Sequence, residues 1–167
     1  MPSTCKTSRD RHELIIPRVS RKNRKKQAKD RKARMKTSRE LRHISVTINR
    51  PPREVYNFAC KARNLPKWAT GLGGSIKKVN GQWVADSPMG RIKILFAKKN
   101  TFGVLDHDVT LGSGITFHNP LRVIPNREAS EIIFTLYRQP GMTNKKFLQD
   151  TKWVRKDLKI LKGLLEK

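Results

Sequence analysis

The sequence has 167 residues, with 38 Lys and Arg against 13 Asp and Glu, so its net charge is +25. The hydrophobic fraction is 36%, and no run approaches the ~18 consecutive apolar residues of a spanning helix, which excludes an integral membrane protein. The sequence has only two cysteines, Cys5 and Cys60, which are too few for a disulfide framework. No CxxC or Cys/His spacing is present, which excludes a zinc site. The basic start lacks the apolar segment of a secretory signal. We expect a cytoplasmic protein without a cofactor or a metal.

Residues 1–42 carry a net charge of +12 and residues 43–167 a net charge of +13. The first segment has few apolar residues to bury, so it is predicted to be a basic, disordered tail. Its basic run over residues 21–26 is expected to be solvated, with contact to phosphates or to a membrane surface as the alternative. Met35 precedes the first periodic strand, so a native start at Met35 is a second interpretation, in which residues 1–34 are an extension.

The first predicted elements are a strand and two short helices. Residues 43–49 alternate between apolar and polar side chains, which is typical of a half-buried strand. Pro52 is suited to the first turn of a helix that continues through Val55, Phe58 and Ala59. A short helical turn is expected around residues 65–68.

Further strands follow, separated by turns. Asn80-Gly81 predicts a two-residue hairpin that ends at the strand containing residues 83–85. Residues 87–90 are expected to form the next turn, after which Ile92, Ile94 and Phe96 share one face of a strand.

The hairpin over residues 105–123 can be predicted in register. A three-residue loop with a left-handed Gly114 pairs Val109 with Phe117 and sets His107 opposite Asn119, both on the inward face. A two-residue loop would put the apolar residues of the two strands on opposite faces of the sheet. A last strand contains residues 132–136.

A long helix is expected over roughly residues 143–166. Its apolar stripe comprises Phe147, Thr151, Val154, Leu158, Leu161 and Leu165. Trp153, Ile160 and Leu164 are predicted to widen that stripe, and lysines and arginines to occupy the opposite face. The fold class is therefore α+β: an antiparallel sheet of about seven strands, two short helices after the first strand, and a long C-terminal helix.

Residues 43–167 resemble the START-like, or SRPBCC, superfamily, and in particular its small polyketide cyclase/dehydrase-like members. The resemblance lies in the opening "NRPPREVYNFACKARNLPKW" and in "SPMGRIKILFA", "GVLDHDVTL", "FHNPLRVIPN" and "EIIFTLYRQPGM". It implies a helix-grip fold, in which a curved sheet wraps around the long helix and leaves an apolar cavity. It also implies binding of a hydrophobic small molecule such as a lipid or polyketide.

The predicted ligand-binding residues come from the inward face of the sheet, the long helix and two tryptophans. They are Trp68, Trp83, Ile94, Phe96, Leu105, His107, Val109, Phe117, Asn119, Phe134, Val154 and Leu158. His107 and Asn119 are polar exceptions on that face, so His107 is the candidate catalytic base, oriented by an amide. The alternative is a structural histidine bonded to Asn119 or to a backbone carbonyl. Asp106 and Asp108 point outward and are expected to pair with Lys or Arg, and His118 is predicted to be solvated.

Three functions remain open at this point. The first is binding of a hydrophobic small molecule, and the second is a cyclase or dehydratase activity that uses His107. The third, less favoured, is nucleic-acid binding through the basic tail, which predicts an affinity that falls steeply with salt. Membrane insertion is not expected, and the sequence indicates no oligomeric state.

Overall fold

The structure is a computed structural model, and it describes residues 38–167. The predicted tail therefore lies almost wholly outside the described residues and stays a prediction. The chain begins with β1 (Leu41–Ile48), α2 (Pro52–Ala59) and the 3-10 helix η1 (Ala62–Lys67). Seven strands follow and the long helix ends the chain: β2 (Ile76–Val79), β3 (Gln82–Ser87), β4 (Gly90–Phe96), β5 (His107–Leu111), β6 (Thr116–Asn119), β7 (Leu121–Asn126), β8 (Ala129–Tyr137) and α3 (Asn144–Leu165).

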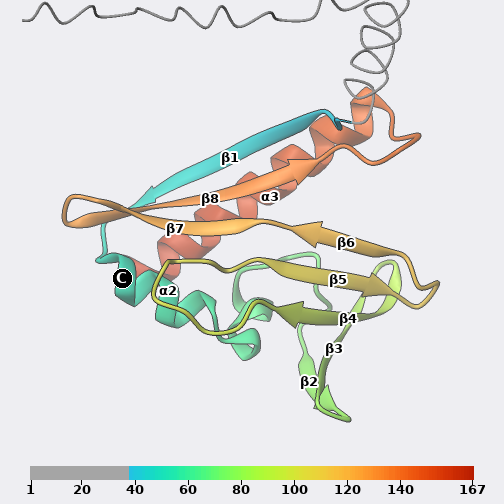
Figure 1. The fold of residues 1–167 in the computed structure, drawn as a ribbon, viewed down its shortest axis with the longest axis horizontal. Coiled ribbons are helices and arrows are strands. Elements are labelled where there is room, and N and C mark those ends of the chain that lie inside the picture. The colour runs from blue at the N-terminus through green and yellow to red at the C-terminus, as the bar shows by residue number, and fades with distance from the viewer. Residues whose placement is uncertain (1–37) are drawn as a thin grey trace, which may run out of the picture. The chain divides into compact units, whose positions relative to one another are not determined.

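All strand pairs are antiparallel and fall into two groups, β1-β8-β7 and β2-β3-β4-β5-β6. The two groups meet where the segment before β5 runs beside β7. There Leu105 N donates to Leu121 O at 2.8 Å, and Val123 N donates to Gly103 O at 2.9 Å. Figure 1 shows β6 and β7 running end to end, in line with a single bent strand. Counted in that way, the sheet has the predicted number of strands.

The predicted hairpin register is confirmed. His107 pairs with Asn119 and Val109 with Phe117, and Gly114 is left-handed with a φ of 86°. The Asn80-Gly81 hairpin is confirmed as well, since it joins β2 to β3 with both residues at positive φ. The alternation of apolar and polar residues therefore fixes which face of the sheet is buried.

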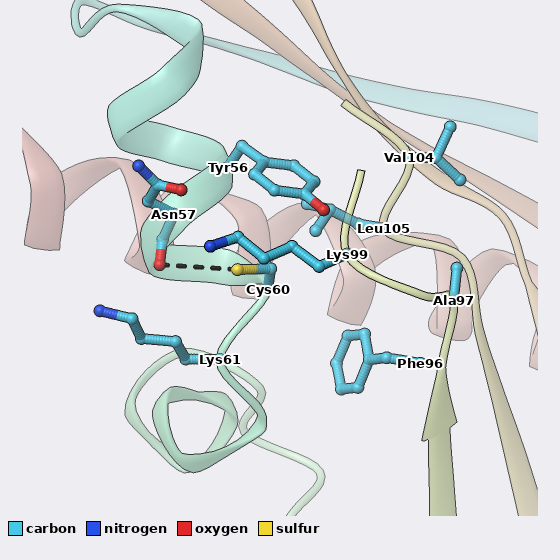
Figure 2. Close-up of a pocket in the computed structure, with 9 residues that line it drawn as sticks. All are labelled: Tyr56, Asn57, Cys60, Lys61, Phe96, Ala97, Lys99, Val104 and Leu105. Carbon is cyan, nitrogen blue, oxygen red and sulfur yellow. Dashed lines mark hydrogen bonds between the residues drawn. The ribbon is translucent and has the colours of Figure 1, made fainter. Parts of the chain in front are cut away.

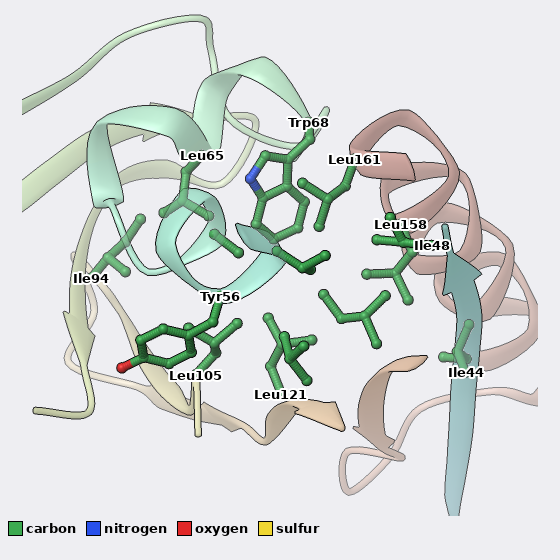
Figure 3. Close-up of a cluster of buried hydrophobic side chains, with 14 of the residues drawn as sticks. Ile44, Ile48, Tyr56, Leu65, Trp68, Ile94, Leu105, Leu121, Leu158 and Leu161 are labelled. Carbon is green, nitrogen blue, oxygen red and sulfur yellow. The ribbon is translucent and has the colours of Figure 1, made fainter. Parts of the chain in front are cut away.

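The core lies between the inner face of the sheet and the helices α2, η1 and α3 (Figure 3). Helix α3 packs mainly against β1 and buries Phe147, Leu158 and Leu161, as the predicted stripe requires. Its C-terminal end is tied to the β1–α2 junction, because Arg50 Nε donates to Leu165 O at 2.7 Å. None of the helices within residues 38–167 is long and apolar enough to cross a membrane.

Three details differ from the sequence-based expectation. Trp153 does not widen the buried stripe: its side chain is 52% exposed and packs under the ammonium group of Lys146, 4.6 Å from the ring centroid. Strand β1 starts at Leu41 rather than residue 43, since Leu41 pairs with Tyr137. Pro120, which lacks a backbone N–H, separates β6 from β7 within the strand expected to be continuous.

Candidate functional site

A cavity of about 500 Å³ lies between the C-terminal end of α2 and the segment that joins β4 to β5 (Figure 2). Its volume is within the range of ~300–1,000 Å³ that is usual for small-molecule sites. The helix side contributes Tyr56, Asn57, Cys60 and Lys61. The sheet side contributes Phe96, Ala97, Lys99, Val104 and Leu105. The lining therefore combines apolar side chains with two lysines, a phenol, an amide and a thiol.

The sheet-side wall is held by hydrogen bonds that centre on Asn100. Asn100 Oδ1 accepts from the backbone N–H groups of Phe102 and Val104 at 3.0 and 3.1 Å, and Asn100 Nδ2 donates to Val104 O at 2.9 Å. The backbone N–H of Asn100 in turn donates to the Tyr56 hydroxyl at 2.8 Å. Since the Tyr56 oxygen accepts this bond, its own O–H remains able to donate to a ligand.

Gly103 fixes the same segment against β7. It has a φ of +71°, and a Cβ atom at this position would collide with the carbonyl oxygen of Val123. Only glycine fits such a left-handed, close approach without strain. The far end of the wall is therefore anchored to β7, while its middle is anchored to α2 through Tyr56.

His107 lies directly behind the cavity wall. Its ring centroid is 5.1 Å from that of Phe96, which lines the cavity, and 6.4 Å from that of Phe134. His107 Nδ1 is 3.2 Å from Leu105 O. Because a carbonyl oxygen only accepts, Nδ1 carries the proton, and in the neutral ring Nε2 is an acceptor. Nε2 has no hydrogen-bond partner within residues 38–167.

The electrostatics favour a neutral imidazole. Burial lowers the pKa of His107 below its ordinary value of 6.5, and this effect outweighs the hydrogen bond to Leu105 and the charge of Asp108, which both raise it. Asn119 lies opposite His107 in register, but the ring is oriented by the backbone carbonyl of Leu105 and not by the expected amide. The bond to the Leu105 carbonyl is the one that a structural role for His107 predicts, and it uses Nδ1. It leaves Nε2 without a partner in the part of the chain that the structure describes.

Trp68 supplies a fully buried polar atom without a partner among the described residues. Its side chain is buried, and within residues 38–167 Nε1 has no hydrogen-bond partner. Figure 3 shows the indole between Leu65 and Leu161, with its nitrogen on the side that faces Leu65. The loop after Trp68 is tied to α3, because Asp157 Oδ1 accepts from Thr70 N and Thr70 Oγ1 at 3.1 and 2.6 Å. A buried indole N–H without an acceptor is costly to the fold, but Trp68 does not line the cavity between α2 and the β4–β5 segment.

The twelve residues predicted to bind a ligand fall into three groups. Phe96 and Leu105 line the cavity. Trp68, Ile94, His107 and Leu158 are buried in the interior. The remaining six are half-buried and do not line that cavity: Trp83, Val109, Phe117, Asn119, Phe134 and Val154.

Sequence reasoning missed the α2 side of the cavity and most of the β4–β5 segment. Tyr56 stands in the opening motif, directly after Val55, and that motif indicates the fold and not a site. Lys99 and Val104 lie in a stretch without periodicity, where Asn100 and Gly103 mark an ordered loop. Asparagine and glycine are common in ordered turns, so Asn100 and Gly103 were the sequence signal for a structured wall at this place.

Both outward carboxylates are paired, Asp106 with an arginine as expected and Asp108 with a different kind of partner. Asp106 forms an ion pair with Arg122 and accepts a hydrogen bond from Leu121 N at 2.9 Å. Asp108 pairs with His118 at 2.7 Å instead of with a Lys or Arg. His118 is exposed, as predicted, and its partner is this carboxylate.

No family model matches the chain, and no curated protein matches its sequence. The fold is similar to that of an uncharacterised protein from Bacillus thuringiensis, at 13% identity and a TM-score of 0.61, over 77% of this chain and 100% of that one. Ara h 8.0201 has 13% identity and a TM-score of 0.58, over 77% and 98% of the two chains. DynU16, a protein in the dynemicin biosynthetic locus, has 16% identity and a TM-score of 0.59, over 78% and 48%. The chain thus spans about half the length of DynU16.

The chain has the helix-grip fold of the START-like, or SRPBCC, proteins. The predicted fold class is thereby confirmed for the described residues. Identities of this size show the fold alone, so the cyclase-like subgroup stays a prediction. In this helix-grip domain, the cavity lies at the α2 end of the sheet, and the buried His107 lies behind its wall.

Proposed function

We propose that this protein binds a hydrophobic small molecule in the interior between the sheet and its helices, with the α2 cavity as the binding site or its entrance. The observation that carries the proposal is the continuity between cavity and core. Tyr56 and Leu105 line the cavity and belong to the buried hydrophobic cluster, and Phe96 lines the cavity while packing against that cluster. An apolar ligand in the cavity would therefore extend an existing apolar surface.

Polar atoms at or behind this surface would fix the ligand's orientation. The Tyr56 O–H is a donor in the cavity lining, and the neutral His107 Nε2, behind the Phe96 wall, is an acceptor. Ligand pockets typically combine an apolar lining with a few such groups. A ligand with one hydroxyl or carbonyl on an apolar skeleton matches this set, and a lipid or a polyketide has that chemistry.

Native mass spectrometry of the protein purified from its own cells tests the proposal. We expect a population heavier than the apoprotein by the mass of one organic compound, which an organic extract recovers. Apoprotein alone, in preparations that have not passed through detergent or organic solvent, would contradict the proposal.

Catalysis at His107 is a second candidate function, favoured by the neutral ring with a free Nε2. Such a nitrogen can accept a proton as a general base. DynU16 belongs to a biosynthetic locus, which agrees with this candidate. A dehydratase would convert the bound compound with a loss of water, about 18 Da, and His107→Gln would stop the conversion while the compound stays bound. Conversion at an unchanged rate in His107→Gln would contradict a catalytic role.

A further inference from the structure

The charge of the α2 cavity is unbalanced. Lys61 and Lys99 are among its nine lining residues, whereas no Asp or Glu is. Both lysines are exposed, and neither has an acidic partner within residues 38–167. Several other basic side chains of the same domain do have one, such as Arg122 with Asp106 and Lys162 with Glu166. The cavity therefore carries two positive charges that the surrounding protein does not neutralise.

The two lysines approach the cavity from opposite walls. Lys61 follows the C-terminal end of α2, and Lys99 belongs to the segment between β4 and β5. Figure 2 shows the Lys99 side chain reaching across from that segment towards Asn57 and Cys60 at the end of the helix. A lysine near a helix C-terminus is favourable on its own, because it interacts with the free carbonyl groups. That explanation covers Lys61 but not Lys99, which stands on another element.

The apolar part of the lining lies beside these charges. Phe96, Val104 and Leu105 supply a hydrophobic wall, and Tyr56 adds a hydroxyl that can donate. A ligand that satisfies the whole lining needs an apolar body and one negative group. Lysine ammonium groups bind anions as point charges, without the planar two-point geometry of arginine. A single carboxylate meets that requirement.

We propose that the ligand is an amphipathic carboxylate, with its carboxylate between Lys61 and Lys99 and its apolar part against Phe96 and Leu105. This inference rests on the proposed function, since it specifies the chemical class of the ligand that the cavity binds. It also gives part of the positive charge of the domain a definite role.

A matched pair of probes tests the inference on the full chain. Decanoate and 1-decanol have the same alkyl chain, and only the first is charged at neutral pH. We expect decanoate to bind about tenfold more tightly than decanol in low salt, in isothermal titration calorimetry. Lys61→Gln and Lys99→Gln should each weaken decanoate binding by about three- to tenfold and leave decanol binding unchanged.

Lys98→Gln is the matched control. Lys98 is exposed and adjacent to Lys99, but it does not line the cavity, so its loss should leave both affinities unchanged. Equal binding of the two probes, or an effect of Lys98→Gln as large as that of Lys99→Gln, would overturn the carboxylate assignment while the binding function stands. If neither probe binds, the proposed function fails together with the inference.

Discussion

The hydroxyl oxygen of Tyr56 accepts a hydrogen bond from the backbone N–H of Asn100 at 2.8 Å. This contact joins α2 to the segment between β4 and β5, and the cavity lies between these two elements. The Tyr56 ring is buried in the core, while its hydroxyl orders the opposite wall. The shape of the site is therefore coupled to the packing of the fold.

Tyr56→Phe should lower the free energy of unfolding by about 0.5–1.5 kcal/mol, because it leaves the part-buried Asn100 N–H without its acceptor. Chemical denaturation measures this change. Tyr137→Phe is the control, since the Tyr137 hydroxyl makes no hydrogen bond within the described residues. A loss of similar size in both variants would mean that the Tyr56–Asn100 bond has no special role.

Gly103→Ala should destabilise the fold on the order of 3 kcal/mol, because strain at a positive φ adds to a collision with the Val123 carbonyl. Gly114→Ala provides the comparison. Gly114 also has a positive φ, but open space surrounds its Cβ position, so we expect a loss of about 1–2 kcal/mol. Thermal or chemical denaturation of both variants checks the difference, and equal losses would show that the approach to β7 is not tight.

His107 should make the stability of the protein depend on pH. Burial lowers its pKa in the folded state, so the unfolded chain binds a proton first as the pH falls below about 6.5. The contribution of His107 to the free energy of unfolding is thus fully present above pH 6.5. It falls by up to about 1.4 kcal/mol per pH unit below that, until the folded state is also protonated.

The measurement is the free energy of unfolding between pH 8 and pH 5 for the wild type and His107→Gln. The variant should lose this part of the pH dependence. His43→Asn, which changes an exposed histidine on β1 whose charge does not act on His107, should keep it. An identical slope in the wild type and His107→Gln would show that the ring is not held neutral by burial.

The sequence predicts the sheet and the long helix well, because their signals are local and periodic. The pairing of His107 with Asn119 follows from strand parity and from the one loop length that puts both apolar sets on the same face. Trp153 shows the limit of that reasoning. The helical period places it at the margin of the stripe, and only the tertiary packing decides that it lies outside, against Lys146.

The cavity could not be predicted in the same way. Its two walls are more than thirty residues apart in the sequence, and no periodic pattern links Tyr56 to Asn100. Their meeting depends on how α2 packs against the end of the sheet. The alternation of side chains along a strand identifies the residues on the inner face, such as Phe96. It does not give the distance from that face to the nearest helix.

Filling the cavity tests the central claim most directly. Ala97 lines the cavity, whereas Leu95 lies two residues earlier on β4, outside the lining and 71% exposed. The measurement is the affinity of the uncharged fluorescent probe 1-aminoanthracene for Ala97→Trp and for Leu95→Trp. We expect Ala97→Trp to weaken binding at least about tenfold, because the indole occupies the site, and Leu95→Trp to bind like the wild type. Equal affinity in all three proteins, or no binding to the wild type, would contradict a ligand site in this cavity.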